Sequence, residues 1–503
     1  MNSRPDPTLI SGGMGVRISC WSLARIVSMM GALGVVSGTG LELVYPRTLQ
    51  NGDPGGHVRR AFDELARRQP ALAEPVNRLF DNYYIKGGKE AGKPYKPVPV
   101  WKLSRVEGYG RAPDSFWEPA RELQILSIAA NFAEVWLAKE GHGGFVGINF
   151  LRKIERPMPC ALYGAILAGV DYVVMGAGNP SHIPGMLRLL SRHEPASMPL
   201  KVYGTRSDSG EFLILARPRA FVGDRSAALP QPKFLAIVSS FGLAQALAAD
   251  PETRPYGFVV EGPSAGGHNA PPSKVRFDDQ RQPILVYTEH DQADIGAIAA
   301  LGLPFWLAGS YASPQRLRQA LACGAVGIQF GTLAALSAQS GMKPEVRAQA
   351  LRMISGGELK VTDTMVSPTG FPFKVAQLPG TLADKAVYQR RKRICDISML
   401  QANYLTAEGK LGYRCPAEPV DSFIAKGGRE QNTAGRACLC NGLLASAGFA
   451  QIRADGYMEP AIVTLGEDLQ PVRDLLALLP PGQDNYTIGK ALRFLQKIIK
   501  AEG

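Results

Sequence analysis

The chain has 503 residues, of which 45% are hydrophobic and 20% charged, the proportions of an ordinary globular protein with a large core. No apolar run reaches the roughly 18 residues that a membrane-spanning helix needs, and the nearest candidate, residues 18–36, contains Arg25. Pro5, Asp6 and Pro7 stand where a secretory signal would carry basic residues. We therefore predict a cytoplasmic protein with no membrane partner.

The net charge is +12, from 56 Lys and Arg against 44 Asp and Glu. This excess is compatible with nucleic acid, an anionic membrane surface or phosphorylated ligands. The only dense basic run, Arg390 to Arg393, has no nucleic-acid motif around it. We interpret it as a solvated helix face and expect no nucleic-acid partner.

Eight short, mostly apolar runs alternate with longer helical patterns up to about residue 340. Each run is bounded by Gly, Pro or Ser, as is typical of strands buried on both faces of a parallel sheet. The predicted strands are Gly15–Ser19, Leu33–Ser37, Phe145–Asn149, Tyr172–Met175, Phe234–Ser239, Phe258–Glu261, Phe305–Ala308 and Val326–Phe330.

Eight strands interleaved with helices predict an α/β chain that closes into a (β/α)₈ TIM barrel. A doubly wound open sheet is the structural alternative. Helices are expected over Ser22–Met30 and Pro159–Ala168, and a third opens at Ser313 with Pro314 in its first turn.

The alternation of predicted strands and helices is interrupted once and stops at about residue 340. A segment of about residues 41–120, in which a helix is expected over Val58–Arg68, is interpreted as an insertion after the second strand. Beyond residue 340 we expect helices over Glu345–Ile354 and Tyr486–Lys500, and a turn-rich loop over Ser367–Phe373. The predicted domains are therefore a barrel over 1–340 and a cysteine-bearing lid or second domain over 341–503.

The ends of the seventh and eighth predicted strands have the composition of a phosphate site. One strand runs into Gly309 and Ser310, and the other into Gln329-Phe330-Gly331-Thr332. Glycine lets backbone N–H groups approach a phosphate, and the loops after strands seven and eight of this fold often bind one. The alternative is that these glycines only make tight turns.

His268 is the strongest candidate for acid–base chemistry. It follows Gly266 and Gly267 beyond the end of the sixth strand, where the reactive residues of a parallel barrel gather. A neutral imidazole suits proton abstraction near neutral pH. The alternative is a loop histidine on the surface with no role.

At this point the chain resembles the nitronate monooxygenase family, formerly 2-nitropropane dioxygenases, over roughly residues 14–340. The family's Ala-Gly-Gly-His motif is similar to residues 265–268, and its Gln-x-Gly-Thr phosphate loop to residues 329–332. Its strand-three asparagine corresponds to Asn149 and its early methionine to Met14. The chain departs from the family in having Gly13 before that methionine, Ser310 in place of a glycine, and Glu261 where many members carry glutamine.

The resemblance implies a flavoprotein on a TIM barrel, with FMN as cofactor and His268 as the catalytic base. It implies an oxidoreductase that uses O₂ to convert nitroalkanes or nitronates to carbonyl compounds and nitrite. The residues it implies for cofactor binding are Met14, Asn149, Glu261, Gly266, Gly309, Ser310, Gln329, Phe330, Gly331 and Thr332.

Two other functions stay open. The Gly-Gly-His feature is shared with flavin-dependent enoyl reductases, which take a hydride from NAD(P)H and act on a thioester that an acyl carrier protein can hold. A ligand-binding or scaffold protein that kept the barrel and lost turnover is the third possibility. The substrate class, the use of O₂ as oxidant and the acyl carrier protein as a partner are therefore expectations.

Seven cysteines are too few and too scattered for a disulfide framework. Four of them, Cys395, Cys415, Cys438 and Cys440, crowd into one 46-residue window. Buried structural thiols are the favoured interpretation, and we predict no metal ligand. A metal or iron–sulfur centre is the second interpretation, and a redox-active Cys438/Cys440 pair is the third.

Overall fold

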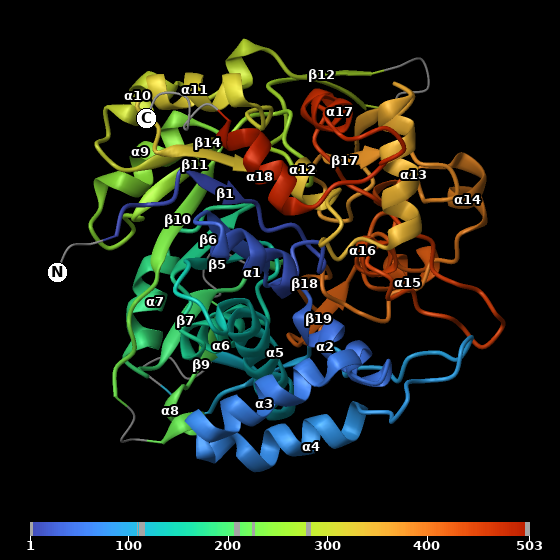
Figure 1. Cartoon of the computed structure of the whole chain (residues 1–503). Helices are drawn as coiled ribbons and strands as arrows, with labels where there is room; N and C mark the ends of the chain where they lie inside the picture. Colours follow the sequence, from blue (N-terminus) through green and yellow to red (C-terminus); the bar gives the residue numbers. More distant parts are fainter. Residues whose placement is uncertain are drawn as a thin grey trace.

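The computed structural model describes residues 4–107, 109, 116–205, 212–223, 227–277 and 283–497. Eight parallel strands hydrogen-bond in the closed order β1-β15-β14-β11-β10-β6-β5-β2 (Figure 1). The predicted barrel is confirmed, and the open sheet is excluded because β1 pairs with both β2 and β15. The strands are β1 Leu9–Ser11, β2 Leu33–Ser37, β5 Val146–Leu151, β6 Tyr172–Gly176, β10 Lys233–Val238, β11 Gly257–Glu261, β14 Phe305–Ala308 and β15 Gly327–Phe330.

The first predicted strand is wrong, whereas the other seven lie within two residues of the observed ones. Residues 15–19 form a turn, in which Arg17 has a φ of 59°. This turn is tied to the barrel because the N–H of Ser37 donates to the carbonyl of Ser19 over 2.9 Å. Val16 and Ile18 of this turn are buried while Gly15 and Arg17 are less so, and this alternating burial resembles that of a strand.

Helices surround the barrel. Those that follow the strand alternation are α1 Trp21–Met29, α5 Arg121–Lys139, α6 Met158–Leu167, α7 Ile183–Ser191, α9 Phe241–Ala249, α10 Ile295–Ala299 and α11 Pro314–Ala322. The predicted start of α11 is confirmed, because the Ser313 hydroxyl accepts a hydrogen bond from the N–H of Arg316. The ring is completed by α18, Ile488–Gln496, which packs against α1 and α11. Of the helix predicted over 486–500, residues 498–500 lie outside the described part.

Between β2 and α5 the chain forms a separate group of elements, in the region where the insertion is predicted. The predicted helix over 58–68 is confirmed by α3, which packs against α5. Residues 108 and 110–115 of this segment lie outside the described part. The elements are α2 Leu41–Gln50, α3 His57–Arg68, α4 Ala73–Tyr83, β3 Leu103–Arg105 and β4 Phe116–Pro119, with single turns at Pro54–Gly56 and Pro70–Leu72.

Beyond β15 the chain folds over the carboxyl ends of the barrel strands (Figure 1). Its elements are α12 Thr332–Ala335, α13 Pro344–Ser355, β16 Val361–Thr364, β17 Phe373–Ala376, α14 Lys385–Arg390, β18 Ala402–Leu405, β19 Leu411–Arg414, α15 Val420–Ala425, a turn at Glu430–Thr433, α16 Leu439–Ser446 and α17 Gln470–Ala477. The predicted helix over 345–354 is confirmed by α13. The predicted domain boundary at residue 340 stays a prediction.

Small peripheral elements complete the fold. β3 and β4 of the insertion form a sheet of order β3-β4-β9-β7 with two later strands, and β8 pairs in parallel with β18. The remaining elements are β7 Ala196–Pro199, β8 Val202–Tyr203, β9 Leu213–Ala216, α8 Arg219–Val222, β12 Lys274–Phe277, β13 Pro283–Val286 and a turn at Glu289–Asp291. None of the helices within the described ranges is both long enough and apolar enough to cross a bilayer.

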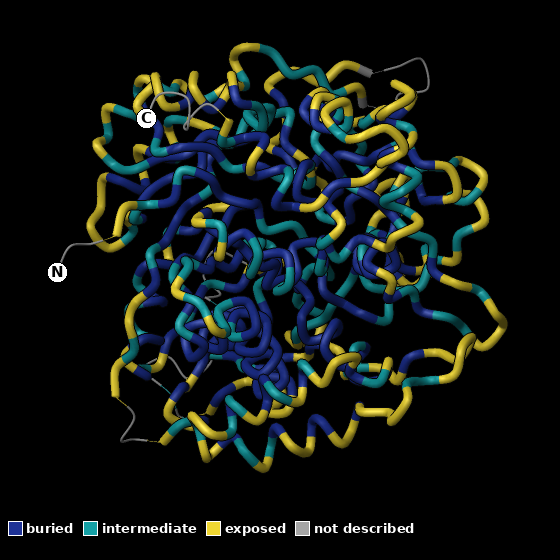
Figure 2. The backbone as a smooth tube through the Cα atoms, in the orientation of Figure 1, coloured by how far each residue is buried: buried dark blue, intermediate teal, exposed yellow. Residues whose placement is uncertain are grey.

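The core has two layers, and Figure 2 shows the buried backbone running through the centre of the molecule. One layer separates the strands from the helices. The other fills the barrel interior and consists of Ile10, Leu33, Val35, Tyr172, Val174, Leu235, Val259, Trp306 and Ala308. Because the interior is filled by side chains, a ligand site must lie at the mouth of the barrel.

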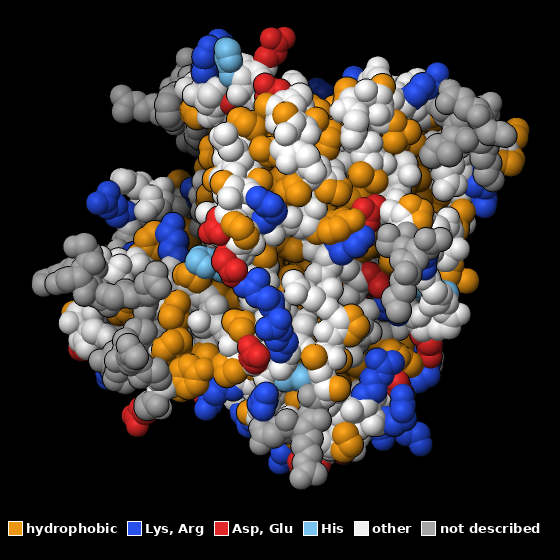
Figure 3. Space-filling model, turned by 90° about the vertical axis from the view of Figure 1, so that its left-hand side faces the viewer, with side chains coloured by type: hydrophobic (Ala, Val, Ile, Leu, Met, Phe, Trp, Pro, Cys, Tyr) orange, Lys and Arg blue, Asp and Glu red, His pale blue; other side chains and the backbone are white. Residues whose placement is uncertain are grey.

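The basic run at 390–393 is not the solvated helix face that we predicted. Only Arg390 belongs to α14. The guanidinium of Arg391 donates to the carbonyls of Tyr388 and Arg436, and that of Arg393 donates to the carbonyl of Glu418. Backbone carbonyls accept hydrogen bonds from these two guanidinium groups. The pattern of charged residues in the sequence gives no sign of such bonds. On the face shown in Figure 3 basic and acidic side chains are interspersed.

Candidate functional site

A cavity opens at the carboxyl ends of the barrel strands, and every site residue predicted from the sequence lines it. The space between the protein atoms is about 1700 Å³, part of it open to solvent. The predicted residues that meet there are Met14, Asn149, Glu261, Gly266, His268, Gly309, Ser310, Gln329, Phe330, Gly331 and Thr332.

The floor of the cavity depends on close contact between the loops after β1 and β5. A Cβ atom on Gly13 would lie 2.1 Å from the Cβ of Asn149, so only glycine fits between the two loops. The N–H of Gly12 donates to the carbonyl of Phe330 over 2.8 Å. Met14 is held by the hydroxyl of Ser19, which accepts its N–H over 3.0 Å.

The loops after β14 and β15 supply glycines and hydroxyl side chains to the cavity wall. Gly309 and Ser310 both have left-handed backbones, with φ of 80° and 59°. This explains why a glycine suits the second position, and the Ser310 hydroxyl donates to Ser264 over 2.8 Å. In the described part of the chain the buried Oε1 of Gln329 has no hydrogen-bond partner. A buried acceptor of this kind requires a donor, and a bound ligand would supply it.

Glu261 ends β11 at the same mouth. Burial raises the pKa of its carboxyl from 4.5 to about 7. The carboxyl is therefore partly protonated at neutral pH, and it can either donate or accept a hydrogen bond.

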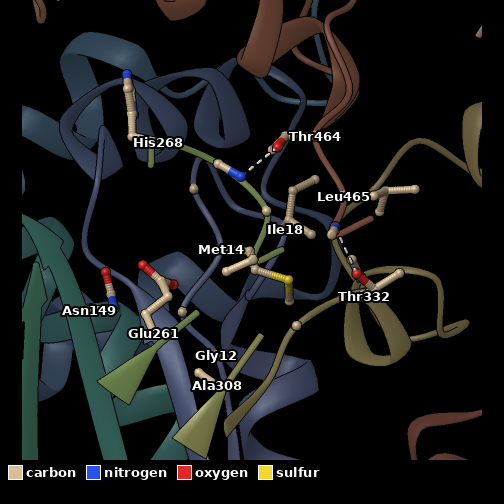
Figure 4. A pocket seen from close by; sticks show the side chains of 18 of the residues that line it. Gly12, Met14, Ile18, Asn149, Glu261, His268, Ala308, Thr332, Thr464 and Leu465 are labelled. Atoms are coloured by element: carbon tan, nitrogen blue, oxygen red, sulfur yellow. Dashed lines mark hydrogen bonds between the residues drawn. The ribbon is translucent and has the colours of Figure 1, made fainter. Parts of the chain in front are cut away.

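His268 lies where the C-terminal part of the chain covers the cavity. Its Nε2 is 2.7 Å from the hydroxyl oxygen of Ser367, and its ring meets that of Phe373 edge to face at 4.9 Å. Burial, assisted by the positive charge of Lys153, lowers the pKa of the imidazole from 6.5 to about 3. Figure 4 shows the side chain extending away from Glu261. The imidazole is therefore neutral at neutral pH.

The sequence did not predict the segment that covers the cavity, which we call the roof. Residues 464–467 of the C-terminal part cross above the barrel loops (Figure 4). The Thr464 hydroxyl accepts the N–H of Gly267 over 2.8 Å, and the Thr332 hydroxyl accepts the N–H of Gly466 over 3.0 Å. No local pattern marks this segment as part of the site, because its partners lie more than one hundred residues away.

A second missed feature is the lysine pair at the edge of the site. Lys153 is half-buried, and its Nζ lies 3.3 Å from the centroid of the Phe371 ring. Burial lowers the pKa of this ammonium to about 7. Lys153 and Lys201 line a groove that continues from the cavity past Met399 and Leu400. Basic side chains therefore line a path that leads into the cavity.

The residues present fit FMN. The glycine-rich loops after β14 and β15 suit a phosphate, and the cavity wall is largely apolar, as a flavin ring requires. The unpaired Oε1 of Gln329 matches the hydrogen-bonding edge of such a ring.

No protein-family model matches the chain, and no curated protein matches it. Among solved structures the chain is similar to FabK from Thermotoga maritima, at 13% identity and a TM-score of 0.47, covering 99% of this chain and 94% of that one. It is similar to nitroalkane oxidase from Streptomyces ansochromogenes at 14% and 0.41, covering 99% and 98%. The enoyl reductase domain of MlnA from Bacillus amyloliquefaciens gives 12% and 0.38, covering 76% and 89%. Because these TM-scores lie below 0.5, the likenesses add no evidence on activity.

Proposed function

We propose that the protein is an FMN-dependent oxidoreductase that oxidises nitronates with O₂, in the manner of the nitronate monooxygenases it resembles. The observation that carries this proposal is the meeting of all the predicted site residues in one cavity, with the acceptor atom of Gln329 left unpaired. FMN, when bound, would accept electrons from the substrate and pass them to O₂.

The protein's own groups favour an anionic substrate. The ammonium of Lys153 acts on His268 electrostatically, so it lies near enough to attract a negative charge at the same place. A base whose pKa is about 3 removes a proton from carbon only weakly. A nitronate has already lost that proton, so it suits this site better than the neutral nitroalkane.

For a nitroalkane, His268 would act through Nδ1. With a proton on Nε2, the ring donates to the Ser367 hydroxyl and leaves Nδ1 as the basic atom. Ser367 lies 2.8 Å from the hydroxyl oxygen of Thr369, so the ring orientation is held by a short chain of hydroxyls. The Phe373 ring excludes water from one edge of the imidazole.

A second candidate is an NAD(P)H-dependent enoyl reductase acting on a carrier-bound thioester. The observation that favours it is the groove with Lys153 and Lys201, which suits a long substrate with an anionic arm. In that reaction His268 and Glu261 would orient or protonate the thioester.

The experiment distinguishes the two candidate functions by determining which compound reduces the bound flavin. The purified protein should release about one FMN per chain on denaturation. Mixed anaerobically with propyl-2-nitronate it should bleach at 450 nm, and with NADPH it should not. Bleaching by NADPH alone would favour the reductase, and flavin that neither reagent reduces would indicate a binding protein. A protein that cannot be loaded with FMN would end the proposal.

A further inference from the structure

Glu261 places a carboxyl in the cavity without a partner from the protein. It is the last residue of β11 and lines the cavity, and Figure 4 shows its carboxyl projecting from the strand end into that space. In the described part of the chain this carboxyl makes no hydrogen bond and no ion pair. An enclosed polar group without a partner costs free energy, so the cavity keeps a hydrogen-bonding position that a ligand can fill.

The wall around this carboxyl is apolar. Ala308 of β14 is opposite Glu261 in the strand register, and Ile237 of β10 also lines the cavity. Burial, and not a charged neighbour, raises the pKa of the carboxyl to about 7. Among the described residues, the other titratable side chains that line the cavity are His268, Tyr311, Cys440 and Asp468. Its position in the wall therefore keeps the carboxyl largely neutral below pH 7.

A neutral carboxyl attracts a different ligand from an ionised one. A carboxylic acid donates its O–H, and hydrogen bonds to an ionised acceptor are the strong ones. A carboxylate only accepts hydrogen bonds, and it repels a second anion. An anion placed beside Glu261 therefore binds to the protonated form and keeps the proton on the carboxyl.

His268 and Glu261 are suited to different tasks. The imidazole has its Nε2 against the hydroxyl of Ser367, and Figure 4 shows it extending away from Glu261. With the proton on Nε2, the neutral ring presents only Nδ1 to the cavity, and this atom is an acceptor. An acceptor cannot donate to an anion, so the donor has to come from another side chain. Glu261 supplies one when it is protonated.

We propose that Glu261 selects the substrate of this cavity: its protonated carboxyl donates a hydrogen bond to a planar anion that carries two oxygens on one atom, such as a nitronate or a carboxylate. The identity of the natural anion rests on the proposed function. When binding starts from the ionised carboxyl, one proton is taken up from the buffer. The products are a carboxylic acid and the anion that it hydrogen-bonds, and no electron is transferred.

The first experiment compares anion affinity at pH 6 and pH 8 in FMN-loaded protein. The probe is methacrylate, which has the planar shape of propyl-2-nitronate and does not reduce a flavin, and the flavin spectrum reports its binding. Glu261→Gln carries an amide that donates at both pH values. At pH 6 wild type and variant should bind alike within about twofold. At pH 8 the variant should bind about tenfold more tightly, because a carboxyl with a pKa of about 7 is then mostly ionised.

This expected gain in affinity cannot come from a misfolded variant. The pKa of Lys153 is also about 7, but this lysine is present in both proteins and cancels in the ratio of their affinities. Glu42→Gln is the matched control. Burial raises the pKa of Glu42 to about 7 as well, but this residue lies on α2 and does not line the cavity. Its variant should follow wild type at both pH values.

A second measurement leaves Glu261 unchanged. Calorimetry in buffers of different ionisation enthalpy gives the number of protons taken up with each methacrylate, with or without flavin. The protein carries Lys153→Met, so that this ammonium contributes nothing. At pH 8 about 0.9 proton should be taken up per anion, since a carboxyl with a pKa of about 7 has lost that fraction beforehand.

An affinity ratio between Glu261→Gln and wild type that is the same at pH 6 and pH 8 would overturn the inference. So would uptake below about a tenth of a proton, or no binding of methacrylate at millimolar concentration. Anaerobic reduction by propyl-2-nitronate is measured on the same preparations. Reduction with a constant ratio contradicts only this inference, and a ratio that changes with pH in protein that is not reduced contradicts only the proposed function.

Discussion

The Nε2 of His268 lies 2.7 Å from the hydroxyl oxygen of Ser367, which belongs to a loop of the C-terminal part. The pair joins a residue of the barrel mouth to a residue outside the barrel. The orientation of the imidazole is therefore decided by a segment that the barrel alone does not contain. Predictions about this site have to test both partners.

The first prediction concerns proton abstraction. His268→Asn should lower turnover of neutral 2-nitropropane by about 10²–10⁴ and largely spare propyl-2-nitronate, which has already lost the proton. Steady-state kinetics on the two substrates measures this directly. Ser367→Ala, which leaves the ring in place without its partner, should show a smaller loss on the nitroalkane. Equal losses on both substrates in His268→Asn would make the residue one that binds substrate or supports the fold.

The second prediction concerns the pH dependence of stability. Burial raises the pKa of Glu261 from 4.5 to about 7. Between these values the unfolded chain ionises while the folded protein keeps its proton, so the contribution to stability is complete below pH 4.5 and is lost as pH rises to 7. Glu261→Gln never ionises and escapes this loss.

In thermal unfolding of flavin-free protein, the melting temperature of Glu261→Gln should gain ~1–3 °C on wild type between pH 5 and pH 8. Glu42 and Glu134 are shifted in the same direction, but they are present in both proteins and cancel in the difference. A difference that stays constant from pH 5 to pH 8 would show that the Glu261 carboxyl ionises normally.

The third prediction compares two neighbouring glycines. The methyl group of Gly13→Ala would collide with Asn149 at 2.1 Å, and this should destabilise the protein by ~1–3 kcal/mol. The control Gly12→Ala places its methyl 3.5 Å from Gln329, an ordinary contact. Urea unfolding of the flavin-free proteins should therefore separate the two. If both variants unfold at the same urea concentration, the loops are not in the close contact described here.

The fourth prediction concerns the roof. Thr464→Val removes the acceptor for the N–H of Gly267 and leaves that group unpaired, which should cost about 1–2 kcal/mol in stability and weaken flavin binding. Thr464→Ser keeps the hydroxyl and should restore both. Flavin titration and urea unfolding measure the two effects. Serine failing to restore them would assign the loss to the missing methyl group.

Much of the barrel was predictable because its signals are local. A strand such as β14 is a short apolar run with a glycine after it, and α11 carries its cap at Ser313 and its proline at 314. The first strand was misplaced because Val16 and Ile18 alternate with less buried residues, as in a strand, while residues 15–19 form a turn. Apolar residues indicate that a segment is buried. A buried segment can be either a strand or a turn that covers strands, so composition does not distinguish the two.

The sequence by itself determined the alternation of strands and helices, and with it which residues stand at the strand ends. Parallel strands of a closed barrel must bring those ends together, so Asn149, Gln329 and His268 were predictable members of one site. Only the tertiary structure decided the roof. The hydrogen bonds from the N–H of Gly267 to Thr464 and from the N–H of Gly466 to Thr332 join residues whose separation along the chain leaves no periodic trace. Contacts of that kind depend on how the whole chain packs, whereas strand and helix patterns depend only on neighbours.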